Sequence, residues 1–379
     1  MKARKPINQA SVAKAAGVSR STVAFALNER LSSRVRTDTR LNILKIAERL
    51  GYRPHRPAQI MRTGRSQMVG LLHHMGMVQT VLERVTYASA SIQKHGYQPY
   101  AIDTVGLLDS GTLPLDSLLD ARVDGLILSG AHDYLLPAIE SSGIPTVLLM
   151  APERPTSLPS VASDIAQGMR DLTQHALKVG HRRLVLAKTP FVNLDANGAP
   201  VASEREQGFS DATVAAGGQC VRFEDLKKAK SHYRSLMAGT DGIVGCMVSL
   251  PVVTPDFDPY EPGRAAFQAL LDLGPLPDIV LFRNDDWALG ALSLCRKKGI
   301  RVPEDLAVAG FDNTAAGRIS YVPLTTVAQP CQAVAEAGVA LLLSLMKGGT
   351  LSPEKRKIRI PCTPIIRESC GAQFETNPP

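Results

Sequence analysis

Residues 12–28, VAKAAGVSRSTVAFALN, carry side chains whose types and spacing suit the reading of DNA. The segment shows two short helical patterns joined by residues 16–18, and Ser19 is a good N-cap for the second helix. Apolar residues at helical spacing would bury the two helices against each other, namely Val12, Ala16, Val18, Val23 and Leu27. Together these features predict a helix-turn-helix.

The second of these helices leaves Arg20, Ser21, Ala24 and Phe25 facing outward. An α-helix fits the major groove of B-DNA, which is about 12 Å wide, and each base pair presents a distinct pattern of donors and acceptors there. We therefore expect this helix to contact base edges.

Neighbouring residues supply the elements that must position this helix. Asn8 can cap the first helix, and a third helix is expected to end at Gly51 with a left-handed cap. The apolar positions of the third helix are Leu41, Leu44, Ile46, Ala47 and Leu50. The sequence thus predicts a three-helix head over residues 1–54.

The charge distribution supports a nucleic-acid partner. Residues 1–67 hold fifteen Lys or Arg against three acids, a net charge of +12, whereas the whole chain carries +8. The remainder is therefore close to −4. A basic head on a mildly acidic body is expected when one end of a protein neutralises phosphates.

Length and composition favour a large globular chain. With 379 residues and 44% hydrophobic content, we expect two or three domains. No stretch approaches eighteen uninterrupted apolar residues, and the N-terminus MKARKPINQASVAK has no apolar segment of the signal-peptide kind. We therefore predict a cytoplasmic protein without a membrane span.

Metal, cofactor and enzyme chemistry are not predicted. The six cysteines show no CxxC spacing, so we expect small buried hydrophobes rather than zinc ligands or disulfides. His73 and His74 are adjacent on a strand and would point to opposite faces. No nucleophile, phosphate-loop or dinucleotide motif stands in the right context, and Asp285 and Asp286 open a helix whose dipole favours acids.

From Met68 onward, short apolar runs alternate with helix-sized spacers, which predicts parallel sheets with crossover helices. The runs are MVGLL, QPYAID, DGLILS, PTVLLM, RRLVLA, DGIVGCMV, DIVLFR and LAVAGF. These strands are too many for one ordinary sheet, so we expect two open α/β subdomains that face each other across a cleft. Ligands bind beyond the carboxyl ends of such strands.

The chain resembles the lactose/galactose-repressor (LacI/GalR) family of bacterial transcription regulators. Five stretches carry the resemblance: VAKAAGVSRSTVAFALN, AERLGYRPHRPAQIMRTGRS, VGHRRLVL at 179–186, NDDWALGAL at 284–292, and KKGIRVPEDLAVAGFDN followed by PLTTVAQP. The resemblance implies an α/β chain with a helix-turn-helix head, a hinge, and a periplasmic-binding-protein-like core. It also implies a homodimer, a pseudo-palindromic operator and a small effector, a sugar or related metabolite.

The resemblance also implies domain limits. These are a DNA-binding domain at 1–54, a hinge at 55–67, and an effector-binding and dimerisation core at 68–379. Within the core, the N-subdomain is expected at about 68–163 and 328–355, and the C-subdomain at about 164–327 and 356–379. A proline-rich insertion near 250–263 is either a lid or an exposed appendage.

By this resemblance, Arg20 and Ser21 lie where base-reading side chains enter the major groove, and Phe25 takes the third such position. Phe25 either contacts a thymine methyl group or packs into the head's own core. Met61 stands where a leucine usually inserts into the minor groove and bends the DNA. The full set of implied DNA contacts is Asn8, Ser19, Arg20, Ser21, Thr22, Phe25, Asn28, Tyr52, His55, Arg56 and Met61.

The resemblance places effector contacts at Arg205, which would clamp ligand oxygens, and at Asn284 and Asp312, which would hydrogen-bond the ligand. The alternatives are a turn residue at Asn284 and a cap or turn residue at Asp312. The remaining implied contacts are Met75, Gln79, Thr80, Met150 and Trp287.

In the family, an aromatic side chain that stacks on a sugar ring usually follows the first strand of the core. In this chain Met75, Gln79 and Thr80 stand there instead. Trp287 either supplies that face or packs in the core. The scarcity of side chains that stack on or hydrogen-bond a sugar suggests a less polyhydroxylated ligand, an unusual sugar or reduced ligand dependence.

These observations predict a DNA-binding regulator that acts as a repressor and is gated by a carbohydrate-like effector. A solute-binding protein without a DNA role and a sugar-modifying enzyme with an appended helix-turn-helix are the alternatives. The basic head and the missing signal peptide disfavour the first, and turnover of a bound ligand would favour the second. The tail ESCGAQFETNPP lacks leucine heptads, so we expect a dimer rather than a tetramer.

Overall fold

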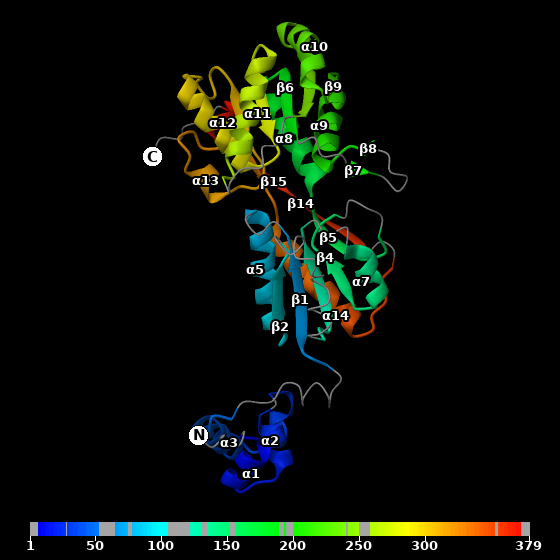
Figure 1. The fold of residues 1–379 in the computed structure, drawn as a ribbon, viewed down its shortest axis with the longest axis vertical. Helices are drawn as coiled ribbons and strands as arrows, with labels where there is room; N and C mark the ends of the chain where they lie inside the picture. The colour runs from blue at the N-terminus through cyan, green and yellow to red at the C-terminus, as the bar shows by residue number, and fades with distance from the viewer. Residues whose placement is uncertain are drawn as a thin grey trace. The chain divides into compact units, whose positions relative to one another are not determined.

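A computed structural model describes residues 7–27, 29–52, 65–74, 78–104, 122–130, 135–151, 156–188, 193–194, 200–239, 242–249, 258–352 and 355–372. The described residues fall into a small N-terminal unit, called the head, and a large unit that begins at Val69, called the body. Figure 1 labels their elements.

The head consists of helices α1 (Gln9–Ala16), α2 (Arg20–Ala26) and α3 (Thr37–Leu50), with a 3-10 turn η1 (Glu29–Arg34). Asn8 forms a capping box with Ser11, and Ser19 caps α2 by accepting from the Thr22 amide at 3.1 Å. Gly17 and Gly51 end α1 and α3 at φ of 65° and 66°, a left-handed conformation that glycine adopts at little cost. The predicted caps are confirmed.

Side chains from all three helices form the core of the head, among them Val12, Val23 and Ile43. The apolar pattern predicted for the third helix is partly wrong, since Leu41 is 52% exposed, Leu44 lies outside the core cluster and Ile43 is fully buried. The stripe runs through Ile43, Ile46 and Ala47, which is the i, i+3, i+4 spacing of one helix face.

The first half of the body is a six-stranded sheet in the order β14-β5-β4-β3-β1-β2. The strands are β1 (Met68–His73), β2 (Gln98–Asp103), β3 (Gly125–Ser129), β4 (Thr146–Leu148), β5 (Ser160–Asp164) and β14 (Lys357–Pro361). Neighbours from β14 to β1 pair in parallel. The helices of this half are α5 (Gln79–Lys94), α7 (Leu136–Ser142) and α14 (Cys331–Met346).

The second half is a five-stranded parallel sheet in the order β12-β11-β6-β10-β9. Its strands are β6 (Arg183–Lys188), β9 (Gln219–Phe223), β10 (Val244–Ser249), β11 (Ile279–Phe282) and β12 (Ala307–Ala309). Its helices are α8 (Ile165–Val179), α9 (Glu204–Ala215), α10 (Leu226–Ala238), α11 (Glu261–Leu273) and α12 (Asp285–Lys298). The predicted α/β class with two parallel sheets is confirmed.

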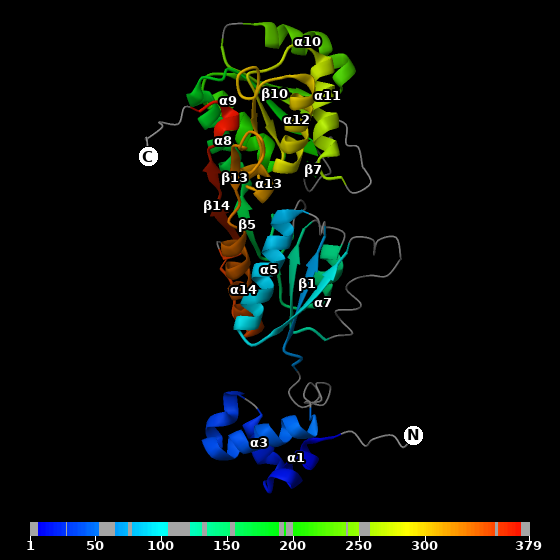
Figure 2. The same ribbon diagram turned by 90° about the vertical axis from the view of Figure 1, so that its left-hand side faces the viewer.

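Alternation along β6 shows how the second sheet is buried on both faces. Leu184 and Leu186 join a core with Phe209 of α9, whereas Val185 and Ala187 join a core with Phe267 of α11. This follows from the two-residue period of a strand. Helices therefore cover both faces of this sheet (Figure 2).

Short elements complete the body. They are the antiparallel pairs β13 (Thr326–Ala328) with β15 (Thr363–Ile365) and β7 (Asn193–Leu194) with β8 (Pro200–Val201), together with α13 (Ala315–Arg318) and η5 (Glu368–Cys370). The predicted division assigned residues from 356 onward to the second subdomain. β14 pairs instead with β5 in the first sheet. The chain therefore returns to the second half of the body only after Pro361.

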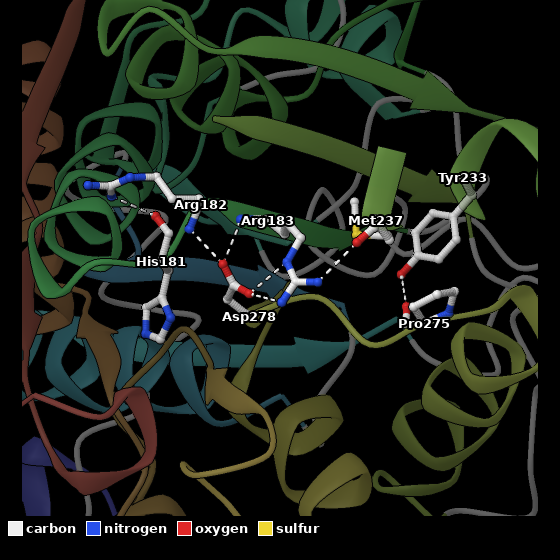
Figure 3. Close-up of polar contacts among 7 residues, drawn as sticks. All are labelled: His181, Arg182, Arg183, Tyr233, Met237, Pro275 and Asp278. Carbon is white, nitrogen blue, oxygen red and sulfur yellow. Dashed lines mark hydrogen bonds and ion pairs between the residues drawn. The ribbon is translucent and has the colours of Figure 1, made fainter. Parts of the chain in front are cut away.

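The amino-end edge of the second sheet is built by the VGHRRLVL motif (Figure 3). The Asp278 carboxylate accepts from the Arg182 and Arg183 amides at 2.7 and 2.9 Å and from the Arg183 guanidinium. Arg183 also donates to the Met237 carbonyl at 3.0 Å. Burial alone would raise the pKa of Asp278, but these hydrogen bonds lower it below its ordinary value. The motif thus joins β6 to β11.

All six cysteines are free thiols, and five of them are buried while Cys220 is half-buried. The prediction of small buried hydrophobes is confirmed for those five. In the described part of the chain, no helix combines the length and the apolar character needed to cross a bilayer.

Candidate functional site

The outward face of α2 is the first candidate site. Arg20 and Ser21 are exposed, and the Ser19 hydroxyl lies 2.7 Å from that of Ser21 and 2.8 Å from that of Thr22. Phe25 is half-buried, and the Arg34 guanidinium lies 5.7 Å from the centre of its ring. Because Phe25 stands outside the buried core cluster of the head, part of its ring is available for an apolar contact.

A hollow beside this face is lined by residues 32–37 and Arg40. Arg34 and Arg36 are exposed there, and Arg40 donates to the Ala26 carbonyl at 3.2 Å, which ties α3 to the end of α2. Exposed arginines next to a base-reading helix are suited to hold backbone phosphates. Sequence reasoning missed Arg34 and Arg36, although the excess of positive charge in this segment was the signal.

The remaining head residues have positioning roles or lie outside the description. Asn8 caps α1. Tyr52 packs against the head core and hydrogen-bonds Gln9, and burial raises its pKa. Asn28, His55, Arg56 and Met61 lie outside the described residues, so their DNA contacts stay predictions, as does the hinge.

A chain of polar side chains in the body joins the two sheets. The Arg84 guanidinium of α5 donates to the Ser129 hydroxyl, at the carboxyl end of β3, at 3.3 Å and to the Gln329 amide oxygen at 3.4 Å. Gln329 follows β13 and donates to Asp312 at 2.7 Å. Asp312 in turn follows β12. We call Arg84, Arg205, Asp312 and Gln329 the arginine cluster.

Asp312 stands at a built turn. Its φ is 110° and that of Asn313 is 55°, a left-handed backbone that is costly for residues other than glycine. Its amide donates to the Val327 carbonyl at 2.8 Å. Burial raises the pKa of Asp312, and the charge of Arg205 and the Gln329 hydrogen bond act in the opposite direction. The Asp312 side chain does not cap a helix. Its backbone forms a turn, as the alternative prediction proposed, but its side chain is bonded to Gln329.

Asp285 holds this turn in place from α12. Its fully buried carboxylate accepts from the Thr314 amide and the Thr326 hydroxyl, both at 2.6 Å. Burial raises the pKa of Asp285 to about 7 despite these hydrogen bonds. The helix-dipole explanation for this acid was therefore incomplete, because its side chain also fixes residues 312–314.

Arg205 lies in the first turn of α9, behind the capping box of Ser203 and Glu206. Its guanidinium lies 4.6 Å from the centre of the Phe311 ring, next to Asp312. Its Nε atom is buried and makes no hydrogen bond within the described structure. An unsatisfied buried donor is costly, and at this edge it is a donor available to a ligand. The structure thus brings Arg205 and Asp312 together.

Asn284 and Trp287 lie in the segment that leads into α12. The Asn284 side chain accepts from the Trp287 amide at 3.1 Å and caps the helix. Its side-chain oxygen is thus engaged in the fold. Trp287 is 5% exposed and belongs to the core between the second sheet and its helices, which favours the packing alternative over a stacking role.

The other predicted effector residues are spread around α5 and β4. Gln79 donates to Glu83 at 2.7 Å, and Thr80 is buried, its carbonyl accepting from the Cys331 thiol at 3.7 Å. The buried side chain of Thr80 contradicts a direct ligand contact in this conformation. Met150 is half-buried after β4, and Met75 lies outside the described residues.

Sequence reasoning missed Arg84 and Gln329 as site residues. Arg84 lies four residues after Thr80 and four before Ala88, both buried. A lone arginine on the buried face of an amphipathic helix was the available signal. Gln329 belongs to the PLTTVAQP stretch, but nothing local indicates its bond to Asp312.

The arrangement suits binding rather than catalysis. It offers guanidinium donors, one carboxylate and one amide at the carboxyl ends of parallel strands, which is where ligands of open α/β sheets bind. Within the described ranges, no group of three or more His, Cys, Asp or Glu side chains is placed to hold a metal ion.

Comparison with family models matches three parts of the chain. Residues 10–55 match bacterial regulatory proteins of the lacI family. Residues 173–370 match a periplasmic binding protein-like domain, and residues 82–239 match the periplasmic binding proteins and sugar binding domain of the LacI family.

Two relatives illustrate the similarity along the whole length. The chain is 28% identical to the HTH-type transcriptional regulator CelR of Thermobifida fusca over 359 residues, covering 90% of this chain and 92% of CelR. It is 27% identical to the HTH-type transcriptional repressor CytR of Escherichia coli K12, covering 98% and 99%.

Solved structures show the same fold. A lac repressor dimer bound to operator and the anti-inducer ONPF matches with a TM-score of 0.74 at 23% identity, over 97% of this chain and 100% of that one. A CelR–cellobiose complex matches with a TM-score of 0.61 at 26% identity, over 96% and 99%.

Proposed function

The chain belongs to the LacI family of bacterial regulatory proteins, and we propose that it is a repressor whose binding to a DNA operator is gated by a small effector. The observation that carries this proposal is the outward face of α2, with Arg20 and Ser21 exposed on a firmly capped helix of a basic head. The relatives are named as transcriptional regulators.

On the DNA side, we propose that two copies act together. The lac repressor, whose fold the chain shares, is a dimer on its operator, and a homodimer would place two heads on the halves of a pseudo-palindromic site. We divide the chain into a DNA-binding domain at 1–54, a hinge at 55–67 and an effector-binding and dimerisation core at 68–379. A protein that acts on bacterial operators works in the cytoplasm.

On the effector side, the arginine cluster supports a site for a carbohydrate or related metabolite. CelR has been solved with cellobiose. Arg84 belongs to the first half of the body and Asp312 to the second, and Gln329 joins them. A ligand that replaces this contact would change the balance between arrangements of the two halves, and couplings of this kind amount to about 1–3 kcal/mol.

The test is selection of DNA by the full chain from a randomised pool, followed by titration of the selected site. We expect a pseudo-palindromic sequence. Arg20→Ala should weaken binding by about 1–3 kcal/mol and relax the preference at one position in each half-site. Lys45→Ala removes another exposed charge of the head, on α3, and is the matched control, expected to leave the sequence preference intact.

Two outcomes would contradict this function. If the pool yields no enriched sequence, the chain is not a sequence-specific regulator. If Arg20→Ala and Lys45→Ala have the same effect on every sequence, the outward face of α2 does not read bases.

A further inference from the structure

We infer that the arginine cluster binds an anion, namely a small sugar or polyol that carries a carboxylate or phosphate group, rather than a neutral sugar. This inference rests on the proposed function only in taking the cluster as the effector site. It names the chemical class that the residues of this chain select.

The charges of the cluster do not balance. Asp312 is the one carboxylate of the cluster, and the positive charges of Arg205 and Arg84 act on it. Three nearby acids are held by neutral donors of the fold: Glu83 accepts from Gln79, Asp164 caps α8, and Asp285 accepts from Thr314 and Thr326. Within the four residues of the arginine cluster, two guanidinium groups face one carboxylate.

The polar group next to the cluster has acidic partners for its cations. At the carboxyl ends of β6 and β9, Lys188 pairs with Glu206 at 3.0 Å and with Glu224 at 2.8 Å. Arg222 lies 3.4 Å from Glu206. Two cations thus meet two carboxylates, and this neighbouring group needs no further anion.

The donors of the arginine cluster lack acidic partners. In the described part of the protein, neither Arg84 nor Arg205 lies within 4 Å of a carboxylate oxygen. The two bonds of Arg84 are long and go to neutral groups, Ser129 and Gln329, and burial lowers its pKa. Arg205 adds a buried Nε without a hydrogen-bond partner. Half-buried guanidinium groups in this state are stabilised by an incoming anion.

The neighbouring groups fit the rest of such a ligand. The Asp312 carboxylate can accept hydrogen bonds from hydroxyl groups, and the Gln329 amide can both accept from them and donate to them. No aromatic face is free for a neutral sugar among the residues described around the cluster, because Phe311 lies under Arg205 and Trp287 is buried. Guanidinium groups match carboxylates and phosphates in a bidentate manner, so charge takes the place of stacking.

Thermal unfolding of the full chain tests the class of ligand. The probes are D-glucose, D-gluconate, D-glucuronate and D-glucose 6-phosphate at equal ionic strength. We expect at least one of the three acids to raise the unfolding midpoint by about 2 °C or more and glucose to leave it unchanged. Comparing the midpoint shifts of the two carboxylates, gluconate and glucuronate, with that of glucose 6-phosphate identifies the anionic group that is bound. Equal shifts with glucose, or no shift with any acid, would overturn the inference.

A variant tests the residue. Arg84→Gln keeps a hydrogen-bonding side chain and removes the charge, and we expect it to weaken binding of the effective acid by about tenfold or more. Arg84→Lys should restore part of the affinity, which separates loss of charge from loss of fold. Arg301→Gln removes an arginine that is paired outside the cluster and is expected to bind the acid like the unsubstituted chain. Unchanged binding by Arg84→Gln would contradict the assignment.

The same samples separate this inference from the proposed function. Titration with the selected operator reports whether the chain is a DNA-binding regulator, whatever the ligand. If operator binding responds to glucose and not to the acids, the regulator stands and the anionic class fails. If no operator is selected while the acids bind, the regulator fails and the anion site stands.

Discussion

The two ends of the second sheet hold similar residues in opposite states. At the amino end, the Asp278 carboxylate accepts from two amides and from the Arg183 guanidinium, which also donates to a carbonyl. At the carboxyl end, Asp312 accepts from Gln329 while Arg205 has a buried Nε without a hydrogen-bond partner. The pKa of Asp278 lies below its ordinary value and that of Asp312 above it.

This difference separates stability from binding within one sheet. A carboxylate whose donors are all supplied by the fold stabilises the folded state and has nothing left for a ligand. A buried carboxyl with a raised pKa beside an unsatisfied guanidinium costs stability and keeps capacity for a ligand. The comparison predicts that substitutions at the two ends change different measured quantities.

The largest effect is expected at Arg205. Arg205→Ala should abolish the response of operator binding to whichever probe stabilises the unsubstituted chain, because the guanidinium and its free Nε donor are lost together. Operator affinity without ligand should stay within about tenfold, because Arg205 lies in the body and not in the head that contacts DNA. Fluorescence anisotropy with labelled operator measures both quantities.

Arg170→Ala is the matched control for this prediction. Arg170 lies on the adjacent helix α8 and pairs with Asp211 at 3.0 Å, outside the arginine cluster. Its loss should leave the response unchanged. A response that survives in Arg205→Ala would remove this residue from the site.

The next effect concerns stability at the amino end. Asp278→Asn should lower the free energy of unfolding by about 2 kcal/mol at pH 7, since it leaves charged donors unpaired at the half-buried junction of β6 and β11. Trp287 is the chain's only tryptophan and is buried in this half of the body. Its fluorescence during urea unfolding therefore reports on the stability of this half.

The pH dependence sharpens this prediction. Because the pKa of Asp278 is lowered in the folded state, its stabilisation is present above the ordinary aspartate pKa and disappears as the pH falls through the lowered value. The difference between the unsubstituted chain and Asp278→Asn should thus shrink below about pH 4. Asp305→Asn, which removes the exposed ion pair with Arg301, should have a much smaller effect at pH 7. A constant difference at every pH would refute the role assigned to the Asp278 charge.

Features encoded by local sequence were predictable. The caps at Asn8 and Ser19 depend on residues three positions away, so the head follows from its own sequence. The strands next to the two aspartates were also predicted. β11 follows Asp278 and β12 precedes Asp312, and a fully buried parallel strand is a continuous apolar run in the sequence. In contrast, β5 and β14 were missed because SVASD and KIRIP are short or alternate with polar residues. Their pairing in the sheet, of β14 with β5 and of β5 with β4, identifies them.

The candidate site was only partly predictable for the same reason. Arg205 and Asp312 came from the resemblance to a family, and the contacts that give them their chemistry are long-range. Gln329 is joined to Arg84 across 245 positions of sequence. Trp287 is the opposite case. Its position in the sequence is compatible with stacking on a ligand, and its burial in the structure favours packing in the core. Periodicity identifies the face of a helix but not the partner on the other element.

The smallest effect is expected at Asp312, and it is the strictest test of the comparison. Asp312→Asn keeps the size of the side chain and removes a carboxylate whose pKa burial raises. The folded state already disfavours this charge, so its removal should change the free energy of unfolding at pH 7 by no more than about 0.5 kcal/mol, in either direction. The same fluorescence experiment applies. A loss as large as that of Asp278→Asn would mean that Arg205 and Arg84 depend on Asp312 for stability, and the two ends of the sheet would then be alike.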